Sequence, residues 1–390
     1  MIYQLGPTMG IARYINRLLQ PIYYRVASLT TFFKETDAVH AMDIYTQKGL
    51  LLPTTLFATL HIHDLCTTVS HEEMIQALKR FLDEYYSPEQ LTRGLSIDTI
   101  VKLVQIILEN QLLVFQNKVY RQIKGSAIGS PLTILLMNIY LFYWQTDLVK
   151  RLVGKNEIFG RCFNEVFLTW NGSENEFRSL LHTTVNGKRS PIKITTSMGH
   201  RVNYIDVHIS QINGNLQTGV NHDTDTEPRC LPYVSDHPRR MHSTLFRAAL
   251  IRAVLCCSNI IDFNNERRDI EVTFNTNGYT WDYINEHVNE FFREFNVREL
   301  KYQMHEHKYE KLRRLVFKYD LQQMDMKMKQ RKLQQDKEVW YISSSLKGKA
   351  LTDIRSSYET IWKHYIDDSI ESRRINIEII TQPKYPPNTK

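Results

Sequence analysis

The chain has 390 residues, of which 42% are hydrophobic and 11% are aromatic, and this composition excludes a largely disordered protein. Its length predicts two or three domains around a sizeable core. The formal net charge of +7 permits a polyanionic partner such as nucleic acid but does not require one.

Cysteine usage indicates a reducing compartment. The five cysteines are scattered without metal-type spacing, and no signal segment is visible at the N-terminus, so we expect an intracellular protein.

The first predicted elements are helices followed by a strand. Apolar positions recur at helical spacing through residues 1–50, which predicts a helical N-terminal region. Pro53 interrupts this pattern. Residues 56–65 then alternate between apolar and polar side chains in the manner of a strand with one buried face.

The next stretch predicts two helices and a hairpin. Ser70 is followed three residues later by Glu73, which is the capping-box pattern, so a helix is expected through residues 74–86. A second helix fits residues 95–111. Residues 112–123 predict a hairpin that turns at their central Gln-Asn pair.

An uncharged run from Leu132 to Trp144 raises the question of a membrane anchor. The run has about thirteen residues, whereas a spanning helix needs about 20. We therefore expect a buried core helix. The residues at its entry are Gly125, Gly129, Ser130 and Pro131, of which serine favours a cap and proline the first helical turn.

The second half changes from strands to helices. Residues 160–172 predict two short strands about a turn at Asn164–Glu165, and alternating segments continue to Val220. Helical patterns follow beyond Pro228. A basic helical stretch over residues 308–340 then leads to an irregular tail.

The entry to the core helix carries a resemblance to a known family. RQIKGSAIGSP, residues 121–131, resembles the Q-x-x-G-x-x-x-G-S-P segment of reverse transcriptases, especially those of Penelope-like retroelements. The match covers most of residues 10–310. Four other segments resemble family motifs in the family's order: TLFATLHIHDLCTTVSHEE (55–73), EIFGRCFNEVFLTWNGSENEF (157–177), VNYIDVHI (202–209) and LPYVSDHPRRMHSTLFRAALIRAVLCCS (231–258).

The resemblance implies an α+β fold with the right-hand architecture of polymerases. Partial fingers would occupy residues 1–55, and the palm, with intervening finger helices, residues 56–225. A helical thumb that resembles a helix-turn-helix would occupy residues 226–310, and a basic helical extension with an irregular tail residues 311–390.

The same resemblance assigns the catalytic positions. His61 stands where the family has its first metal-binding aspartate, and Asn164 and Glu165 stand where it has a pair of aspartates. Two of three carboxylates are therefore replaced. Asp64, three residues after His61 in the same predicted strand, should point to the opposite face and offer no substitute.

Further residues are expected near the template and the nucleotide. Gln122 would lie beside the templating base, while Gly125, Gly129 and Ser130 would form a floor where the backbone comes close to the nucleic acid. Cys66 stands where the family has the tyrosine that discriminates between deoxynucleotides and ribonucleotides.

These replacements predict a copy that is inactive as a polymerase, and the missing basic finger residues of the family's longer N-terminal part predict that the copy is truncated. The family is an RNA-directed DNA polymerase that uses Mg²⁺, but here no metal and no other cofactor is expected, with Glu165 the one retained carboxylate. An RNA or DNA duplex resembling template and primer is the expected partner, and a nuclear location would suit the family. We expect no binding to a membrane and no small-molecule substrate other than the deoxynucleotides that the family uses.

Two alternatives remain open: a non-catalytic nucleic-acid-binding protein and a pseudogene product with no selected function. The protein could be a non-catalytic nucleic-acid-binding protein that uses the groove between palm and thumb, with four arginines as candidate backbone contacts: Arg247, Arg252, Arg313 and Arg314. His61, His63 and His71 also cluster in sequence, but a metal site there lacks convincing further ligands.

Overall fold

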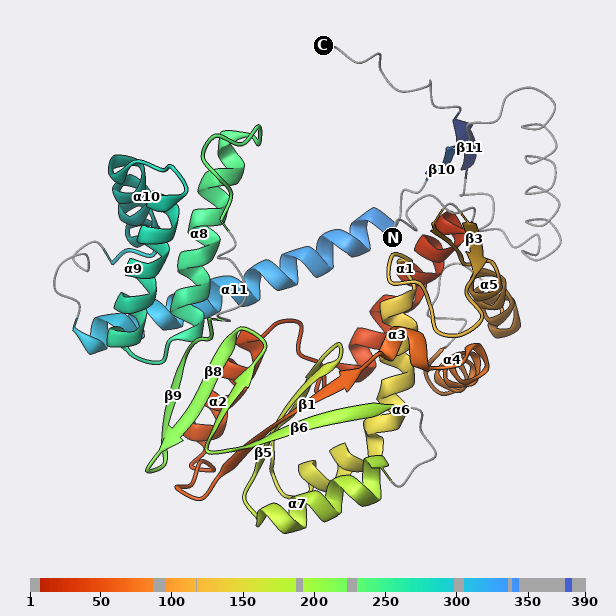
Figure 1. Ribbon diagram of the computed structural model, residues 1–390, viewed down its shortest axis with the longest axis horizontal. Coiled ribbons are helices and arrows are strands. Elements are labelled where there is room, and N and C mark those ends of the chain that lie inside the picture. The colour runs from red at the N-terminus through yellow and green to blue at the C-terminus, as the bar shows by residue number, and fades with distance from the viewer. Residues whose placement is uncertain are drawn as a thin grey trace.

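Figure 1 shows the computed structural model of the protein, in which helices and antiparallel sheets are combined. It describes residues 8–86, 95–116, 118–186, 192–222, 230–297, 305–335, 339–343 and 376–380. The helices are α1 (Met9–Ala27), α2 (Thr36–Gln47), α3 (Leu65–Thr68), α4 (His71–Tyr85), α5 (Ile97–Glu109), α6 (Thr133–Val153), α7 (Glu174–Leu181), α8 (Arg239–Cys256), α9 (Ile260–Thr276), α10 (Trp281–Glu294) and α11 (Glu306–Gln335).

In the described part of the chain, the strands form four sheets. They are β1 (Leu56–His63), β2 (Leu112–Phe115), β3 (Lys118–Arg121), β4 (Phe159–Cys162), β5 (Glu165–Trp170), β6 (Lys193–Gly199), β7 (Arg201–Tyr204), β8 (Val207–Ile212), β9 (Asn215–Val220), β10 (Val339–Ser343) and β11 (Asn376–Ile380). A π-helical turn over His182–Asn186 follows α7.

The central sheet has the strand order β4-β5-β1-β6, and all of its neighbours are antiparallel. The alternation of β1 gives the sheet two different faces. Leu60 lies in the core that contains α1, α4, α5 and α6, whereas Phe57 lies in a second core with α2 and the three-stranded sheet β7-β8-β9. The sheet is therefore covered on both faces at the part of β1 that holds Phe57 and Leu60.

The apolar run predicted as a core helix is α6, which extends beyond it to Val153. Leu136 and Leu141 are buried in the same core as the strands of the central sheet. Among the residues that the structure describes, no helix combines the length and the apolar character needed to cross a membrane.

Local signals in the sequence are confirmed at several helix starts. The side chain of Ser70 accepts a hydrogen bond from the backbone of Glu73, and the Glu73 carboxylate accepts one from the backbone of Ser70, so the capping box is complete. Ser173 and Glu176 form a second capping box at the start of α7.

Two sequence predictions need correction. The hairpin β4-β5 turns at Phe163 and Asn164, since Glu165 is already the first residue of β5. Phe163 has a φ of 53°, which lets the chain reverse one residue earlier than predicted. The predicted irregular tail contains the parallel pair β10-β11, while residues 344–375 between them lie outside the described part of the chain.

The helices α8 to α11 form a second body with its own core, as Figure 1 shows. Its buried residues include Phe246, Phe263, Ile284, Phe291, Tyr309 and Val316. The long helix α11 begins beside α8 and runs toward the side of the molecule that holds α1 (Figure 1).

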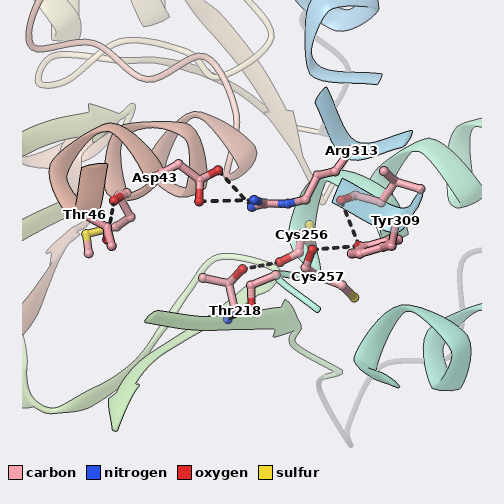
Figure 2. Close-up of polar contacts among 10 residues, drawn as sticks. Asp43, Thr46, Thr218, Cys256, Cys257, Tyr309 and Arg313 are labelled. Atoms are coloured by element: carbon pink, nitrogen blue, oxygen red, sulfur yellow. Dashed lines mark hydrogen bonds and ion pairs between the residues drawn. The ribbon is translucent and has the colours of Figure 1, made fainter. Parts of the chain in front are cut away.

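The two bodies meet where α8 ends against β9 and α2 (Figure 2). The hydroxyl of Thr218 donates to the carbonyl of Cys256 at 2.6 Å, and the hydroxyl of Tyr309 donates to the carbonyl of Cys257 at 2.8 Å. Arg313 reaches across to Asp43 with Nη2 2.9 Å from Oδ2. Cys256 is itself buried in the core that α2 shares with the sheets, so the junction is a packed interface.

Candidate polymerase-type site

The structure brings His61 and Glu165 together. They are direct register partners on the adjacent strands β1 and β5, so their side chains project from the same face of the sheet. Nδ1 of His61 and Oε1 of Glu165 form a hydrogen bond. The two side chains are 44% and 27% exposed, so the pair is open to solvent. The adjacency predicted from the order of the motifs is therefore present in the fold.

Asn164, the third position aligned with the family's aspartates, lies in the turn of the β4-β5 hairpin. Its carbonyl accepts a hydrogen bond from the backbone N–H of Ile62 at 2.9 Å, which fixes the turn against the end of β1. Of the three positions aligned with the family's aspartates, only Glu165 carries a carboxylate, and that carboxylate is bonded to His61.

His63 lies beside His61 but makes a different contact. The two rings are 4.5 Å apart between centroids, as expected for residues on one strand face, and Nε2 of His63 lies 2.6 Å from the hydroxyl of Thr195. His71 lies separately, at the start of α4. Within the described ranges, no group of three potential metal ligands in close reach includes any of these histidines.

Asp64 is placed differently from the prediction. The strand β1 ends at His63, and Asp64 adopts a left-handed conformation with a φ of 49° before the short helix α3. Its carbonyl accepts from the backbone N–H groups of Thr67 and Thr68. The argument from strand alternation therefore does not apply to Asp64, because the chain has already turned out of the sheet.

A buried arginine that the sequence motifs did not single out supports the hairpin. Arg161 is 1% exposed, and its guanidinium donates to Gln145 Oε1 at 2.7 Å, Asn138 Oδ1 at 2.6 Å and the carbonyl of Phe163 at 2.8 Å. It also reaches the hydroxyl of Tyr23 at 3.1 Å. These neutral acceptors satisfy the buried cation and tie the hairpin to α6 and α1. The only feature of the sequence that pointed to this arginine was its position two residues before the turn, within the segment EIFGRCFNEVFLTWNGSENEF.

Gly125 is required by the chain's own backbone. It has a φ of +76°, and a Cβ there would lie 2.1 Å from the carbonyl oxygen of Cys66. The N–H of Gly125 donates to Val69, and the N–H of Ser126 donates to Cys66. Gly125 therefore allows a close approach of two segments of this protein, and its place beside a template stays a prediction.

The other predicted template residues have mixed surroundings. Gln122 is half-buried, and its side-chain amide donates to the carbonyl of Lys124 at 2.9 Å, whereas Gly129 is exposed. Ser130 is buried, and its hydroxyl has no hydrogen-bond partner in the described part of the protein. Of this set, the structure brings Cys66 and Gly125 into direct contact.

A small buried network fixes the loop before α6. Gln111 is 1% exposed and donates to Ser126 Oγ at 3.0 Å, while its Oε1 accepts from the N–H of Ala127 at 2.8 Å. The hydroxyls of Ser126 and Thr133 lie 2.6 Å apart. This network explains how a loop with few apolar side chains holds one conformation.

The cysteines near the site are thiols at neutral pH. Burial raises the pKa of Cys66 above its usual value, and burial followed by the charges of Glu35 and Asp37 raises the pKa of Cys162 to about 11. Neither side chain is therefore a thiolate nucleophile or a ready metal ligand.

Three of the four candidate backbone arginines already have an acidic partner in the chain. Arg247 forms a two-pronged pair with Glu294, with Nε 2.8 Å from Oε2, and Arg313 pairs with Asp43. Arg252 lies 3.7 Å from Asp206. Arg314 is exposed and donates to the carbonyl of Glu310, so it is the one whose charge faces solvent. Contact of these residues with phosphate stays a prediction.

Comparison with known proteins gives one family match and several similar structures. The family described as the animal helix-turn-helix domain matches residues 229–289, which include α8, α9 and part of α10. No curated protein sequence matches the chain.

The similar structures are polymerases. The telomerase of Candida albicans, solved with a TWJ fragment of telomeric RNA, superposes with a TM-score of 0.52 at 12% identity over 78% of this chain and 51% of the telomerase chain. Telomerase of Candida tropicalis gives a TM-score of 0.44 at 11% identity, over 80% of this chain and 53% of that one. The RNA-dependent RNA polymerase of a human picorbirnavirus gives 0.43 at 10% identity, over 77% and 56%.

The similarity to the Candida albicans telomerase establishes the class of fold. The chain has a mixed helical and sheet architecture that resembles the fold of this telomerase, and the segment after β9 matches the animal helix-turn-helix family. It spans about half of the length of that telomerase chain.

Proposed function

We propose that this protein is a nucleic-acid-binding reverse-transcriptase-domain protein of Penelope-like retroelement origin that does not catalyse polymerisation. In this proposal residues 1–55 are partial fingers, 56–225 the palm, 226–310 the thumb and 311–390 a basic extension. The support is the polymerase-like fold, the helix-turn-helix match and the ordered sequence motifs.

The observation that carries the loss of activity is the His61–Glu165 hydrogen bond. Polymerisation needs two divalent ions about 3.5–4 Å apart to hold the attacking and leaving oxygens. Magnesium prefers oxygen ligands in octahedral geometry, and the aligned positions offer a single carboxylate that already has an imidazole as its partner. One glutamate in this state supplies too few oxygen ligands for two ions.

Binding of nucleic acid is supported by the surface around the β2-β3 hairpin. Lys118, Arg121 and Lys124 are exposed, and between them Tyr120 and Ile123 expose 44% and 80% of their surface. Basic side chains that alternate with an aromatic and an apolar group suit a strand whose phosphates and bases are contacted together. The net charge of +7 also favours binding of a polyanion such as nucleic acid.

A primer-extension assay tests the loss of activity. The unmodified chain should extend no primer on an RNA template with Mg²⁺ or Mn²⁺. A triple variant with His61→Asp, Asn164→Asp and Glu165→Asp restores the family pattern and should gain binding of divalent ions, measured by calorimetry. Clear extension by the unmodified chain would contradict the proposal and make the protein an active polymerase.

Salt-dependent binding tests the second half of the proposal. The affinity for an RNA–DNA duplex should fall as salt rises, with a slope that reports the number of bound phosphates. Replacing Lys118, Arg121 and Lys124 by alanine should reduce that slope by about one for each phosphate that is no longer neutralised. Lys79→Ala on α4, which removes an exposed charge elsewhere, is the control. A slope that does not change in the triple variant would exclude this surface.

A further inference from the structure

A second group of polar side chains, separate from the one at His61, lines a cavity between the sheet β7-β8-β9 and helix α9. The cavity has a volume of about 360 Å³ and is lined by side chains from both of these elements. Histidine and carboxylate groups gather on its wall. The histidines come from β8 and from the residues just after β9, and the carboxylates come from α9.

Three of these side chains lie close enough together to hold one metal ion. One ligand atom from each of His222, Glu266 and Asp269 lies within 4.8 Å of the other two. Nε2 of His222 is 2.6 Å from Oε2 of Glu266. Glu266 and Asp269 are three residues apart on α9, so they project from the same side of the helix. The sequence alone does not reveal the group, because the histidine and the carboxylates are separated by more than forty residues.

The backbone on both sides of the group is held firmly. The N–H of Ser258 donates to the carbonyl of Thr218 at 2.9 Å, and Thr218 donates to Cys256, as Figure 2 shows. The N–H of Asn221 donates to the carbonyl of Asp206 at 2.8 Å, directly before His222. These bonds fix β9 against the junction of α8 and α9. The ligands therefore project from two elements that are already joined, which lowers the cost of bringing them together.

The charge of the cavity favours a cation. Asp262 lines the same cavity, and among the described lining residues its only guanidinium is that of Arg201. His208 also lines it, and burial, followed by the charge of Arg201, lowers the pKa of His208 below its usual value. At neutral pH the cavity wall therefore carries more carboxylates than cationic groups.

We propose that His222, Glu266 and Asp269 bind one divalent transition-metal ion of the zinc type. A nitrogen and two carboxylate oxygens are ligands that zinc accepts, and three protein ligands leave a fourth position for water. Tetrahedral geometry with bonds of about 2.0–2.1 Å places ligand atoms about 3.3 Å apart, so His222 and Glu266 must separate slightly and Asp269 must approach. The imidazole distinguishes this site from a magnesium site, which would consist of oxygen ligands.

A bound ion would join two parts of the protein. His222 follows the three-stranded sheet, whereas Glu266 and Asp269 belong to the segment that matches the helix-turn-helix family. The metal would therefore add a cross-link between the sheet and the helical body. Because the ion would bind the folded protein and not the unfolded chain, it would raise the melting temperature.

The test is a titration of the full metal-free chain with Zn²⁺ by calorimetry and with Co²⁺ by visible absorption. We expect one equivalent of each ion, with the intense absorption bands of tetrahedral cobalt. His222→Ala and Asp269→Asn should each weaken binding by about tenfold or more. Glu271→Gln is the matched control, because this carboxylate lies on α9 but pairs with Arg267 and is outside the group. The control should bind as the unmodified chain does.

Both substituted ligand side chains are at the surface, so circular dichroism should show that the variants fold. Zinc should raise the melting temperature of the unmodified chain and of Glu271→Gln, but not of His222→Ala. Binding that persists in both ligand variants, or that is lost in His61→Ala instead, would place the ion elsewhere and overturn the proposal. Absence of binding by the unmodified chain even at about 100-fold molar excess of metal over protein would overturn it as well.

Discussion

Arg313 on α11 and Asp43 on α2 are 270 residues apart in the sequence, yet they form a two-pronged ion pair. Nη2 lies 2.9 Å from Oδ2 and Nη1 3.2 Å from Oδ1. The side chains are only 15% and 20% exposed, and the guanidinium also lies 5.1 Å from the centroid of the Phe317 ring. The pair holds the long helix of the second body against the first body.

Removing this pair should destabilise the junction. Arg313→Ala leaves the carboxylate of Asp43 largely shielded from water without its partner, and we expect a loss of about 2 kcal/mol in the free energy of unfolding. Urea denaturation followed by circular dichroism measures it. Arg314→Ala, at the exposed neighbouring position, should change stability by less than about 0.5 kcal/mol. Equal effects of the two substitutions would contradict a specific role for the ion pair.

A charge inside α6 should be costly. Leu136 is 1% exposed in the main core, so Leu136→Asp must bury a carboxylate without a partner or leave it protonated. We expect a loss of about 4 kcal/mol, seen as a large fall in melting temperature. Ile134→Asp, two residues earlier and 53% exposed, is the control and should leave the melting temperature nearly unchanged. An unchanged melting temperature in Leu136→Asp would mean that α6 is not packed as described.

Two glycines with similar backbone angles should respond differently to alanine. At Gly125 the new Cβ would meet the carbonyl of Cys66 at 2.1 Å in addition to the strain of a φ of +76°, so we expect a loss of about 3 kcal/mol. At Gly49 the φ is +71° but nothing lies within 4 Å, so only the strain of about 1 kcal/mol remains. Denaturation of both variants compares them directly, and a similar loss at both positions would show that the Cys66 segment moves aside freely.

Stability should fall at alkaline pH through buried tyrosines, and Tyr45 offers a test. Its hydroxyl donates to Glu157 at 2.9 Å, and burial, reinforced by the charge of Glu157, raises the pKa of Tyr45 to about 12. A folded-state pKa above the unfolded value of about 10 means that the stabilisation is complete below pH 10 and is lost as the pH rises toward 12.

Tyr45→Phe removes this titration together with the hydrogen bonds to Glu157 and from Asn171. The variant should therefore be less stable at pH 8 and should lose less stability between pH 10 and pH 12. The free energy of unfolding, measured at pH values across this range, checks both statements. The same alkaline slope in both proteins would assign the effect to other tyrosines.

The sequence by itself determined the elements whose signals are local. The Ser70–Glu73 capping box and the alternation of β1 rest on partners a few residues away or on the chain's own periodicity. The core helix α6 was predicted from the length of its apolar run. The neighbourhood of His61 and Glu165 also came from the sequence, because the order of several motifs together indicated which strands must pair.

Only the tertiary structure decided the contacts between distant segments. The turn at Phe163 depends on a buried guanidinium whose partners come from two other helices, and the Arg313–Asp43 pair joins two separate cores. The group at His222 exists because β9 ends beside α9. A side chain meets such partners only after the apolar faces have packed, so their identity depends on the packing of whole elements and leaves no periodic trace in the sequence.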